Sequence, residues 1–291
     1  MSDQILPSLF RLRVRYIKHG RLAYLGHLEV LHTIERVIRR AALPYAVTQG
    51  FSPHMRVGFS SALPVGTSST CEYYDVFLTE LVPHAEALQR LVAASPEDLM
   101  TQECAYVDVR TPALTAQITR VGYRVGLFCR ESASFEASDI ERGLDAIARL
   151  GQIPYARGKK SKVMDIERTL VGYQVAPGAA SGDFIVQLDT RCDNEGALRP
   201  EILLAALDRF LLGQEISPEE RPIVSTGIQD LVSIKSYRVE RVFQMVEDEN
   251  GSLVDPLAAR RQLCWLTEGA GGLPFKLVIL CSRTMYTGFE L

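Results

Sequence analysis

The chain has 291 residues, of which 47% are hydrophobic and 23% are charged, and its formal net charge is −3. This composition excludes an intrinsically disordered protein, which needs low hydrophobicity and high net charge, and the length suits two domains. A net charge so close to zero also argues against a dedicated nucleic-acid binder, because such chains are usually strongly basic.

The first half is predicted to contain six elements in the order β-α-β-β-α-β. Residues 10–18 read FRLRVRYIK, in which Leu12, Val14 and Tyr16 alternate with arginines. Alternation with one apolar face is typical of a half-buried strand, so we expect the arginines on an exposed face. Residues 28–42 carry apolar side chains at helical spacing. The other predicted elements are strands at 56–59 and 71–79, a helix at 83–94 and a strand at 102–110.

The second half is predicted to repeat this element order without strong sequence similarity to the first. Ser138 and Glu141 have the spacing of a capping box for a helix that ends at Leu150. Pro200 is expected at the first position of another helix. The predicted elements are a strand at 121–129, a helix at 138–150, strands at 166–175 and 184–188, a helix at 199–212 and a strand at 233–243.

The repeated order predicts an α+β fold made of two tandem ferredoxin-like (βαββαβ) domains. We place the first domain at 8–112 and the second at 118–246. Residues 247–291 form a C-terminal extension that contains the apolar, strand-like stretch LPFKLVILC and whose role the sequence does not indicate.

The sequence also predicts where the protein resides. The N-terminal residues lack the apolar core of a secretory signal, and no apolar run approaches the roughly 18 residues of a membrane helix. The six cysteines are sparse and form no CxxC pair, which favours a reducing compartment and predicts no metal site. We therefore expect a soluble cytoplasmic protein.

Charge is distributed unevenly along the chain. Residues 1–60 contain nine Lys or Arg and three acids, a balance of +6, so the remainder carries −9. Cations on an exposed sheet or helix face could follow a phosphate backbone. A solvated surface without any ligand explains the same pattern equally well.

A second basic cluster, YARGKKSK at residues 155–162, is expected in a loop before a strand. Short basic runs are typical of surfaces that bind nucleic acids or other anions, although solvated hairpin loops often have the same composition.

The segment TQGFSPHMRVGFSSALPVG is predicted to be a rigid loop, from which Phe51, His54 and Arg56 project. Binding residues concentrate on loops of this kind. His27 lies where a loop meets the predicted helix, so it could act as an acid or base, bind an anion, or only bond to the backbone. The candidate catalytic residues are His27 and His54. The candidate substrate- or RNA-binding residues are Arg13, Arg15, Lys18, Arg39, Arg40, Gln49, Phe51, His54, Arg56, Lys159, Lys160 and Lys162.

Familiar catalytic motifs are missing from the sequence. It contains no GxxxxGK[ST], no GxGxxG after a strand, no HExxH and no GxSxG. The acidic pairs that it does contain are too ordinary to identify an acid–base couple.

Several segments between residues 10 and 240 form one recognisable pattern: Gly26-His27-Leu28-Glu29, Arg39-Arg40, Gln49-Gly50-Phe51-Ser52-Pro53-His54, Leu63-Pro64-Val65-Gly66, Glu72-Tyr73-Tyr74-Asp75, KKSKVMDI and LRPEIL. Through these segments the sequence resembles the radical-SAM-linked protein family, a domain of unknown function fused to or encoded beside radical SAM enzymes. The sequence departs from that pattern at Gly26, Glu29 and Ser52, where the family has Ser, Asp and Asn. The loss of a hydroxyl at Gly26 weakens a catalytic role for this junction.

The resemblance implies a partner that carries the radical chemistry. Radical SAM domains bind a 4Fe–4S cluster through CxxxCxxC, and this chain has no such motif. The cluster and S-adenosylmethionine are therefore expected only in a separately encoded enzyme. Family members are often encoded beside genes for RNA processing and ribosomal proteins, which suggests an RNA or ribosome-linked substrate.

Three functions follow from these observations. The first is a non-catalytic accessory protein that binds RNA or a ribosome-linked substrate for a radical SAM enzyme. The second, suggested by the fold, is a metal-independent RNA endonuclease that uses His27 or His54 as acid or base and a lysine to stabilise the charged intermediate. The third is a protein–protein adaptor without an RNA ligand.

Overall fold

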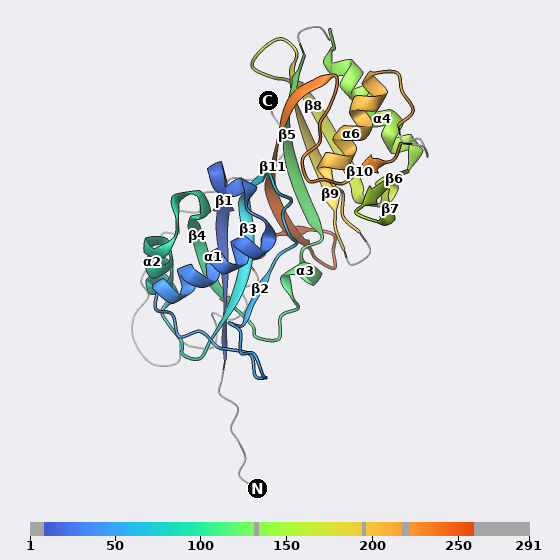
Figure 1. Cartoon of the computed structure of the whole chain (residues 1–291). Coiled ribbons are helices and arrows are strands. Elements are labelled where there is room, and N and C mark those ends of the chain that lie inside the picture. Colours follow the sequence, from blue (N-terminus) through green and yellow to red (C-terminus); the bar gives the residue numbers. More distant parts are fainter. Residues whose placement is uncertain (1–8, 131–133, 194–195, 217–220, 259–291) are drawn as a thin grey trace, which may run out of the picture. The chain divides into compact units, whose positions relative to one another are not determined.

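A computed structural model describes residues 9–130, 134–193, 196–216 and 221–258, and its helices and strands are shown in Figure 1. No helix in these ranges is long and apolar enough to cross a membrane.

The first half is a four-stranded antiparallel sheet with two helices on one face. Its strands pair in the order β4-β1-β3-β2. The apolar residues of β1, including Leu12 and Val14, pack in one core with Val30 and Ile34 of α1 and Leu91 of α2. Its elements are β1 (Phe10–Lys18), η1 (Gly20–Tyr24), α1 (His27–Arg40), β2 (Val57–Phe59), β3 (Thr67–Leu78), α2 (His84–Ala94), η2 (Glu97–Leu99) and β4 (Thr101–Val107).

The second half has the strand order β11-β5-β9-β8, again antiparallel, and its core includes residues of α4 and α6. A second sheet of three short strands has the order β10-β6-β7. The elements are α3 (Leu114–Gln117), β5 (Arg120–Cys129), α4 (Ala137–Leu150), β6 (Gln152–Arg157), β7 (Lys160–Asp165), α5 (Ile166–Thr169), β8 (Leu170–Pro177), β9 (Asp183–Arg191), α6 (Pro200–Leu211), β10 (Ile223–Val224), β11 (Ile234–Glu247) and β12 (Leu253–Val254).

The two halves share one sheet, because β3 and β11 pair in parallel. Val239, Glu240 and Arg241 lie opposite Thr67, Ser68 and Ser69, and this ladder joins the strands into a mixed nine-stranded sheet. The structure thus confirms a mixed α+β fold. The division into domains at 8–112 and 118–246 stays a prediction.

Three local predictions are wrong. The N-cap of α4 is Glu136, whose backbone N–H donates to Asp139, so Ser138 does not cap the helix. Residues 155–162 form part of the β6–β7 hairpin rather than a loop. Residues 166–169 form the short helix α5, because the Asp165 carboxylate accepts the Arg168 N–H at 2.9 Å and starts a helical turn.

Other local predictions are confirmed. Pro200 is the first residue of α6, and His27 is the first residue of α1. The last long strand continues beyond its predicted end to Glu247 and pairs with β12. The predicted strand-like stretch LPFKLVILC lies outside the described residues.

Close packing between β5 and β11 predicts that adding a side chain at Gly122 destabilises the fold. A Cβ placed on Gly122 would lie 2.0 Å from the Phe243 ring, whereas a Cβ on Gly172 would meet no atom within 4 Å. We expect Gly122→Ala to lower the free energy of unfolding by about 1–3 kcal/mol, the usual cost of overpacking, and Gly172→Ala to change it by less than about 0.5 kcal/mol. Urea denaturation of both variants measures this, and equal effects would contradict the packing.

Candidate functional site

Two of the three arginines of β1, Arg11 and Arg13, are buried rather than exposed. Arg13 is 0% exposed and Arg11 is 5% exposed, so the predicted half-buried strand is wrong. The reason is that the connection after β4 and the segment after β12 supply backbone acceptors for both side chains. Thr111 and Pro112 accept from Arg11, and Pro256 accepts from Arg13.

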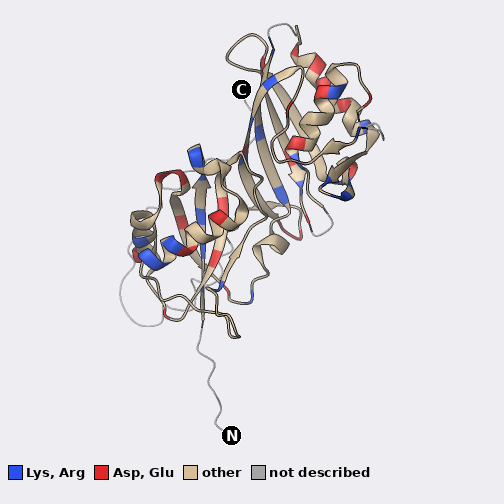
Figure 2. Ribbon diagram, viewed as in Figure 1, with Lys and Arg blue, Asp and Glu red and all other residues tan. Residues whose placement is uncertain are grey.

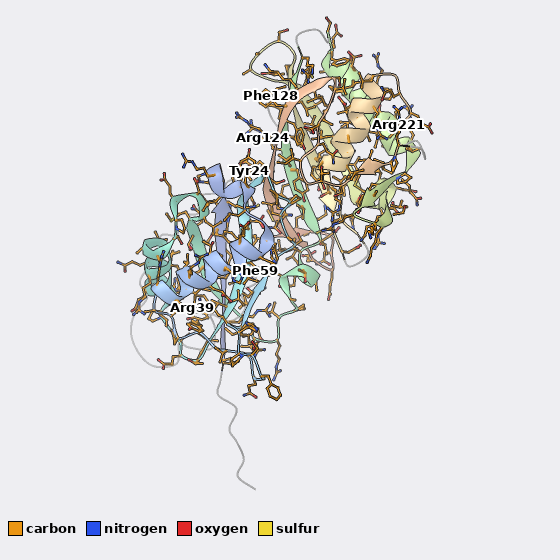
Figure 3. All side chains as sticks on the ribbon, in the orientation of Figure 1. Tyr24, Arg39, Phe59, Arg124, Phe128 and Arg221 are labelled. Carbon is orange, nitrogen blue, oxygen red and sulfur yellow. The ribbon has the colours of Figure 1, made fainter. Side chains whose placement is uncertain are left out.

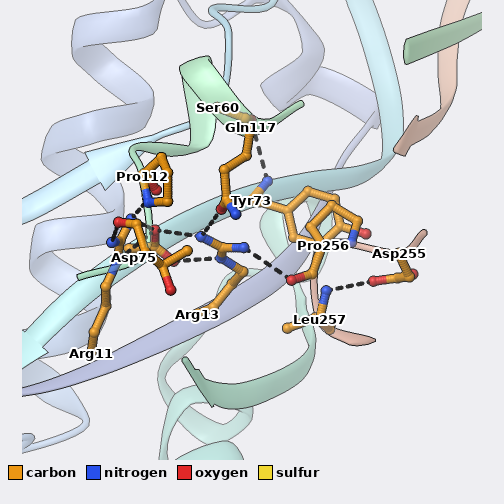
Figure 4. A network of polar contacts seen from close by, with 11 residues as sticks. Arg11, Arg13, Ser60, Tyr73, Asp75, Pro112, Gln117, Asp255, Pro256 and Leu257 are labelled. Carbon is orange, nitrogen blue, oxygen red and sulfur yellow. Dashed lines mark hydrogen bonds and ion pairs between the residues drawn. The ribbon is translucent and has the colours of Figure 1, made fainter. Parts of the chain in front are cut away.

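Asp75 on β3 holds both guanidinium groups (Figure 4). Its carboxylate accepts from Arg11 Nη2 at 2.6 Å and from Arg13 Nε at 2.8 Å. Arg13 also donates to Gln117 Oε1 at 2.8 Å. This network fastens α3 to the sheet, and it leaves Arg13 no accessible surface for the predicted contact with a phosphate.

We expect Asp75→Asn to destabilise the fold by about 3–5 kcal/mol, because it leaves two buried guanidinium groups without a counter-charge. A matched control is Glu86→Gln, which removes an exposed carboxylate from its pair with Arg90 and should cost at most about 0.5 kcal/mol. Denaturant unfolding of the two variants measures the difference. Similar small losses in both would show that the buried network is not what holds this face together.

A second buried ion pair joins the two halves on the other side of β3. Glu72 accepts from Arg241 Nη1 at 3.1 Å and from Gln244 Nε2 at 3.2 Å. Arg241 also donates to the Ser61 carbonyl at 3.0 Å and to the Tyr123 hydroxyl at 3.4 Å. Burial opposes the charge on Arg241, but the Glu72 carboxylate outweighs this effect and the pKa of the guanidinium is raised.

A small cavity lies next to this pair. Its volume is about 10 Å³, which is room for about one water molecule. Lys18 is 2% exposed and donates from Nζ to the Leu25 carbonyl at 2.9 Å. Burial lowers the pKa of Lys18, and the negative charge of Glu72 partly opposes that shift. The lining residues are Tyr16, Lys18, His27, Val30, Phe59, Ser60, Ser61, Ala62, Leu63 and Glu72.

His27 and Ala62 are the exposed residues among those that line this cavity. The His27 ring packs edge-on against Phe59, with the ring centroids 5.6 Å apart, and Phe59 lies beside α1 in Figure 3. His27, Leu63 and Glu72 come from three separate segments that carry the family resemblance, and they all line this one cavity.

Sequence reasoning missed how this site is built. It assigned Lys18 to a surface contact and did not select Glu72, Ser60 or Arg241. The sequence does contain one signal that Lys18 is buried. Lys18 continues the alternation of Leu12, Val14 and Tyr16, so it belongs on the same buried face. No local signal identifies Arg241, which is separated from Glu72 by 169 positions.

The first part of the predicted binding loop, residues 48–56, does not line the cavity, whereas residues 59–63 of the same segment do. The side chains of Gln49, Phe51, His54 and Arg56 all face solvent, and Phe51 has no cover at all. The Thr48 N–H donates to the His54 carbonyl at 2.8 Å, and the Ser52 hydroxyl lies 3.2 Å from His54 Nε2. His27 and His54 therefore belong to different parts of the surface.

The remaining predicted cations are on the surface or partly exposed. Arg39 and Arg40 lie at the exposed end of α1, where Arg39 pairs with Glu35 at 3.4 Å. Arg15 is partly exposed and donates to the Thr70 carbonyl at 3.3 Å.

The basic run forms the tip of the β6–β7 hairpin, where blue positions gather in Figure 2. Gly158, at φ +58°, and Lys159 make the turn. Arg157, Lys159, Lys160 and Lys162 are all exposed, and none of the ion pairs among the described residues involves them.

Within the described ranges, no group of His, Cys, Asp and Glu side chains could hold a metal ion. Cys71, Cys129 and Cys192 are free thiols. Burial raises the pKa of Cys71 to about 12, so this thiol is poorly suited to act as a nucleophile or ligand.

Comparison with known proteins gives one sequence family. The model of a family described as "Uncharacterized protein conserved in bacteria (DUF2344)" matches residues 11–200. No curated protein matches the sequence.

Similar solved structures include a chain of a Cbf5-Nop10-Gar1 complex, with a TM-score of 0.41 and 8% identity over 82% of this chain. This chain spans 50% of that one. A putative glycine cleavage system transcriptional repressor has a TM-score of 0.21 and 8% identity, covering 70% of this chain and 92% of its own. DyPB from Rhodococcus jostii RHA1 has a TM-score of 0.22 and 10% identity, covering 81% and 93%. At these scores, the similarities indicate no shared function.

Proposed function

The chain belongs to this family of uncharacterized bacterial proteins, and we propose that it is a non-catalytic accessory protein that binds RNA or a ribosome-linked substrate. It would act with a separately encoded radical SAM enzyme. The proposal assigns the 4Fe–4S cluster and S-adenosylmethionine to that partner, because the cysteines of this chain form no CxxxCxxC motif.

The β6–β7 hairpin is the observation that carries the RNA-binding role. Residues 152–165 contain four cations and one acid, Asp165, at the end of the hairpin away from the turn, although the whole chain has a net charge of −3. Exposed arginines elsewhere are often neutralised, as in the pairs Arg90–Glu86 and Arg142–Asp139. The hairpin charges have no such partner among the described residues, so they create a local positive potential that attracts a polyanion.

The geometry of the hairpin suits a phosphate backbone. Arg157 lies opposite Lys160 across the two strands, so both side chains emerge on one side, and Lys162 follows two residues later on that side. Alternate residues of a strand are about 7 Å apart. The two-stranded ribbon thus presents three cations on one side, with Lys159 at the turn.

The loop that carries Phe51 supplies a second type of contact. An uncovered aromatic ring with a histidine and an arginine nearby in the sequence suits stacking on an unpaired base. In contrast, the cavity beside His27 has room for about one water, so a ribose cannot enter it to reach Lys18. These two observations favour RNA binding over RNA cleavage by the Lys18 and His27 pair.

The RNA-binding role is tested with single-stranded RNA and the variant Lys159→Ala/Lys160→Ala/Lys162→Ala. Each lost phosphate contact reduces the slope of log K against log salt by about 0.7, so we expect the slope to fall by about 2 and the affinity at low salt to drop at least tenfold. The matched control is Arg21→Ala/Arg142→Ala/Arg149→Ala, which removes three exposed cations from other surfaces. Fluorescence anisotropy measures both.

Equal losses in the two triple variants would mean that net charge alone drives binding. No binding at low salt would leave the adaptor function as the better account. RNA cleavage without metal that is abolished by His27→Ala would replace the accessory role with an endonuclease.

The partner is tested separately. We expect the tagged full chain, purified from its native cell after nuclease treatment, to retain a protein that contains CxxxCxxC and shows the absorbance of a 4Fe–4S cluster. Identification by mass spectrometry and visible absorbance gives the result. Recovery of only ribosomal proteins or RNA, with no such enzyme, would contradict this part of the proposal.

A further inference from the structure

The ammonium group of Lys18 is a buried charge without a counter-ion. Its side chain is 2% exposed, and the Leu25 carbonyl is the acceptor found for its Nζ. An ammonium has three donors, and none of the ion pairs among the described residues includes Lys18. Buried charges in folded proteins are normally paired, so this one needs an explanation.

The neighbouring carboxylate does not provide the missing charge. Glu72 is held by Arg241 and by Gln244, with both oxygens accepting from the same guanidinium nitrogen, at 3.1 and 3.2 Å. Lys18, Arg241 and Glu72 together carry a charge of +1. Glu29 of α1 also attracts the ammonium, but less strongly than Glu72 does, and its own carboxylate accepts the Gly26 N–H at 2.8 Å.

The cavity gives this unbalanced charge access to the surface. Lys18 and Glu72 form its inner wall, the Ser60 hydroxyl lies beside them, and the exposed His27 ring stands at its edge. His27 is also the first residue of the 14-residue helix α1, whose N-terminal end favours negative charge. The Lys18 ammonium and the N-terminal end of α1 with His27 therefore both favour an anion at this place, and Arg241 holds the Glu72 carboxylate.

We propose that the cavity binds an anionic group, with one oxygen inserted against Lys18 and the rest of the group held at the surface by His27. The volume of about 10 Å³ admits one oxygen and excludes a whole phosphate. The ligand is thus a terminal phosphate or carboxylate of a larger molecule. This site is independent of the β6–β7 hairpin, so it does not rest on the proposed function.

The test uses the full chain with inorganic phosphate or acetate at constant ionic strength, followed by calorimetry and thermal unfolding. We expect one of the two anions to bind saturably and raise the melting temperature of the wild type. Lys18→Met should weaken that binding at least tenfold, and His27→Ala should weaken it less. Lys235→Met removes an exposed lysine outside the cavity and should bind like the wild type. Tighter binding of phosphate would indicate a ligand with a terminal phosphate, and tighter binding of acetate would indicate a ligand with a terminal carboxylate.

The pH dependence of anion affinity is a readout that a purely structural lysine would not produce. Burial lowers the pKa of Lys18 from 10.5, and the facing groups are Glu72, Arg241, Glu29, Tyr16 and His27. Without an anion, the unfolded chain holds this proton more tightly, so the wild type gains stability relative to Lys18→Met as pH rises toward 10.5. Anion affinity should fall over the same range, because the ammonium is lost.

Two results would overturn the proposal. The first is saturable binding that is equally strong in Lys18→Met, which would place the anion elsewhere. The second is no saturable binding of either anion, which would mean that the cavity holds a water molecule only. Neither result affects the RNA experiment, because the hairpin variants leave the cavity unchanged.

Discussion

The two carboxylates of β3, Glu72 and Asp75, are the constraint on which the rest of the structure depends. They lie on opposite faces of the same strand, and each gathers guanidinium groups from distant parts of the chain. Removing two charges from water is costly, and the attraction between them compensates only when the geometry is good and the other donors are satisfied. The Asp75 pairs meet this requirement, whereas Arg241 Nε is buried without a hydrogen-bond partner among the described residues. Together the two carboxylates fix the place of β1 and β11 beside β3.

The junction between the two halves relies on these side chains because its backbone ladder is short. β3 and β11 share three paired residues, whereas β11 and β5 share ten. Arg241 and Gln244 extend the junction by reaching Glu72, the Ser61 carbonyl and the Cys71 carbonyl. At the junction of β3 and β11, buried polar side chains thus hold the two strands together, as backbone hydrogen bonds do in the longer ladders of the sheet.

Much of the element order could be predicted from sequence, because alternation and helical spacing are local signals. The burial of β1 could not, since an arginine reads as exposed until its partner is known, and Asp75 lies 64 and 62 positions from Arg11 and Arg13. The sequence also predicts a loop where β6 and β7 form a hairpin, because the basic residues and Gly158 have the composition of a solvated loop. In the cavity, the alternation of β1 places Lys18 correctly, but nothing local indicates the charge that surrounds it.

The position of the cavity has a physical consequence for the junction. Lys18 is close enough to Glu72 and Arg241 for their charges to influence its pKa. An anion beside Lys18 would neutralise the excess positive charge next to the ion pair that joins the halves. Binding there would therefore stabilise the junction as well as the lysine, since the repulsion between Lys18 and Arg241 is then balanced. The hairpin, on the small β10-β6-β7 sheet of the second half, has no such connection to the ion pair. The two candidate ligand sites thus differ in their surroundings. The hairpin carries its charge at the surface, whereas the cavity lies beside the buried ion pair that joins the two halves of the chain.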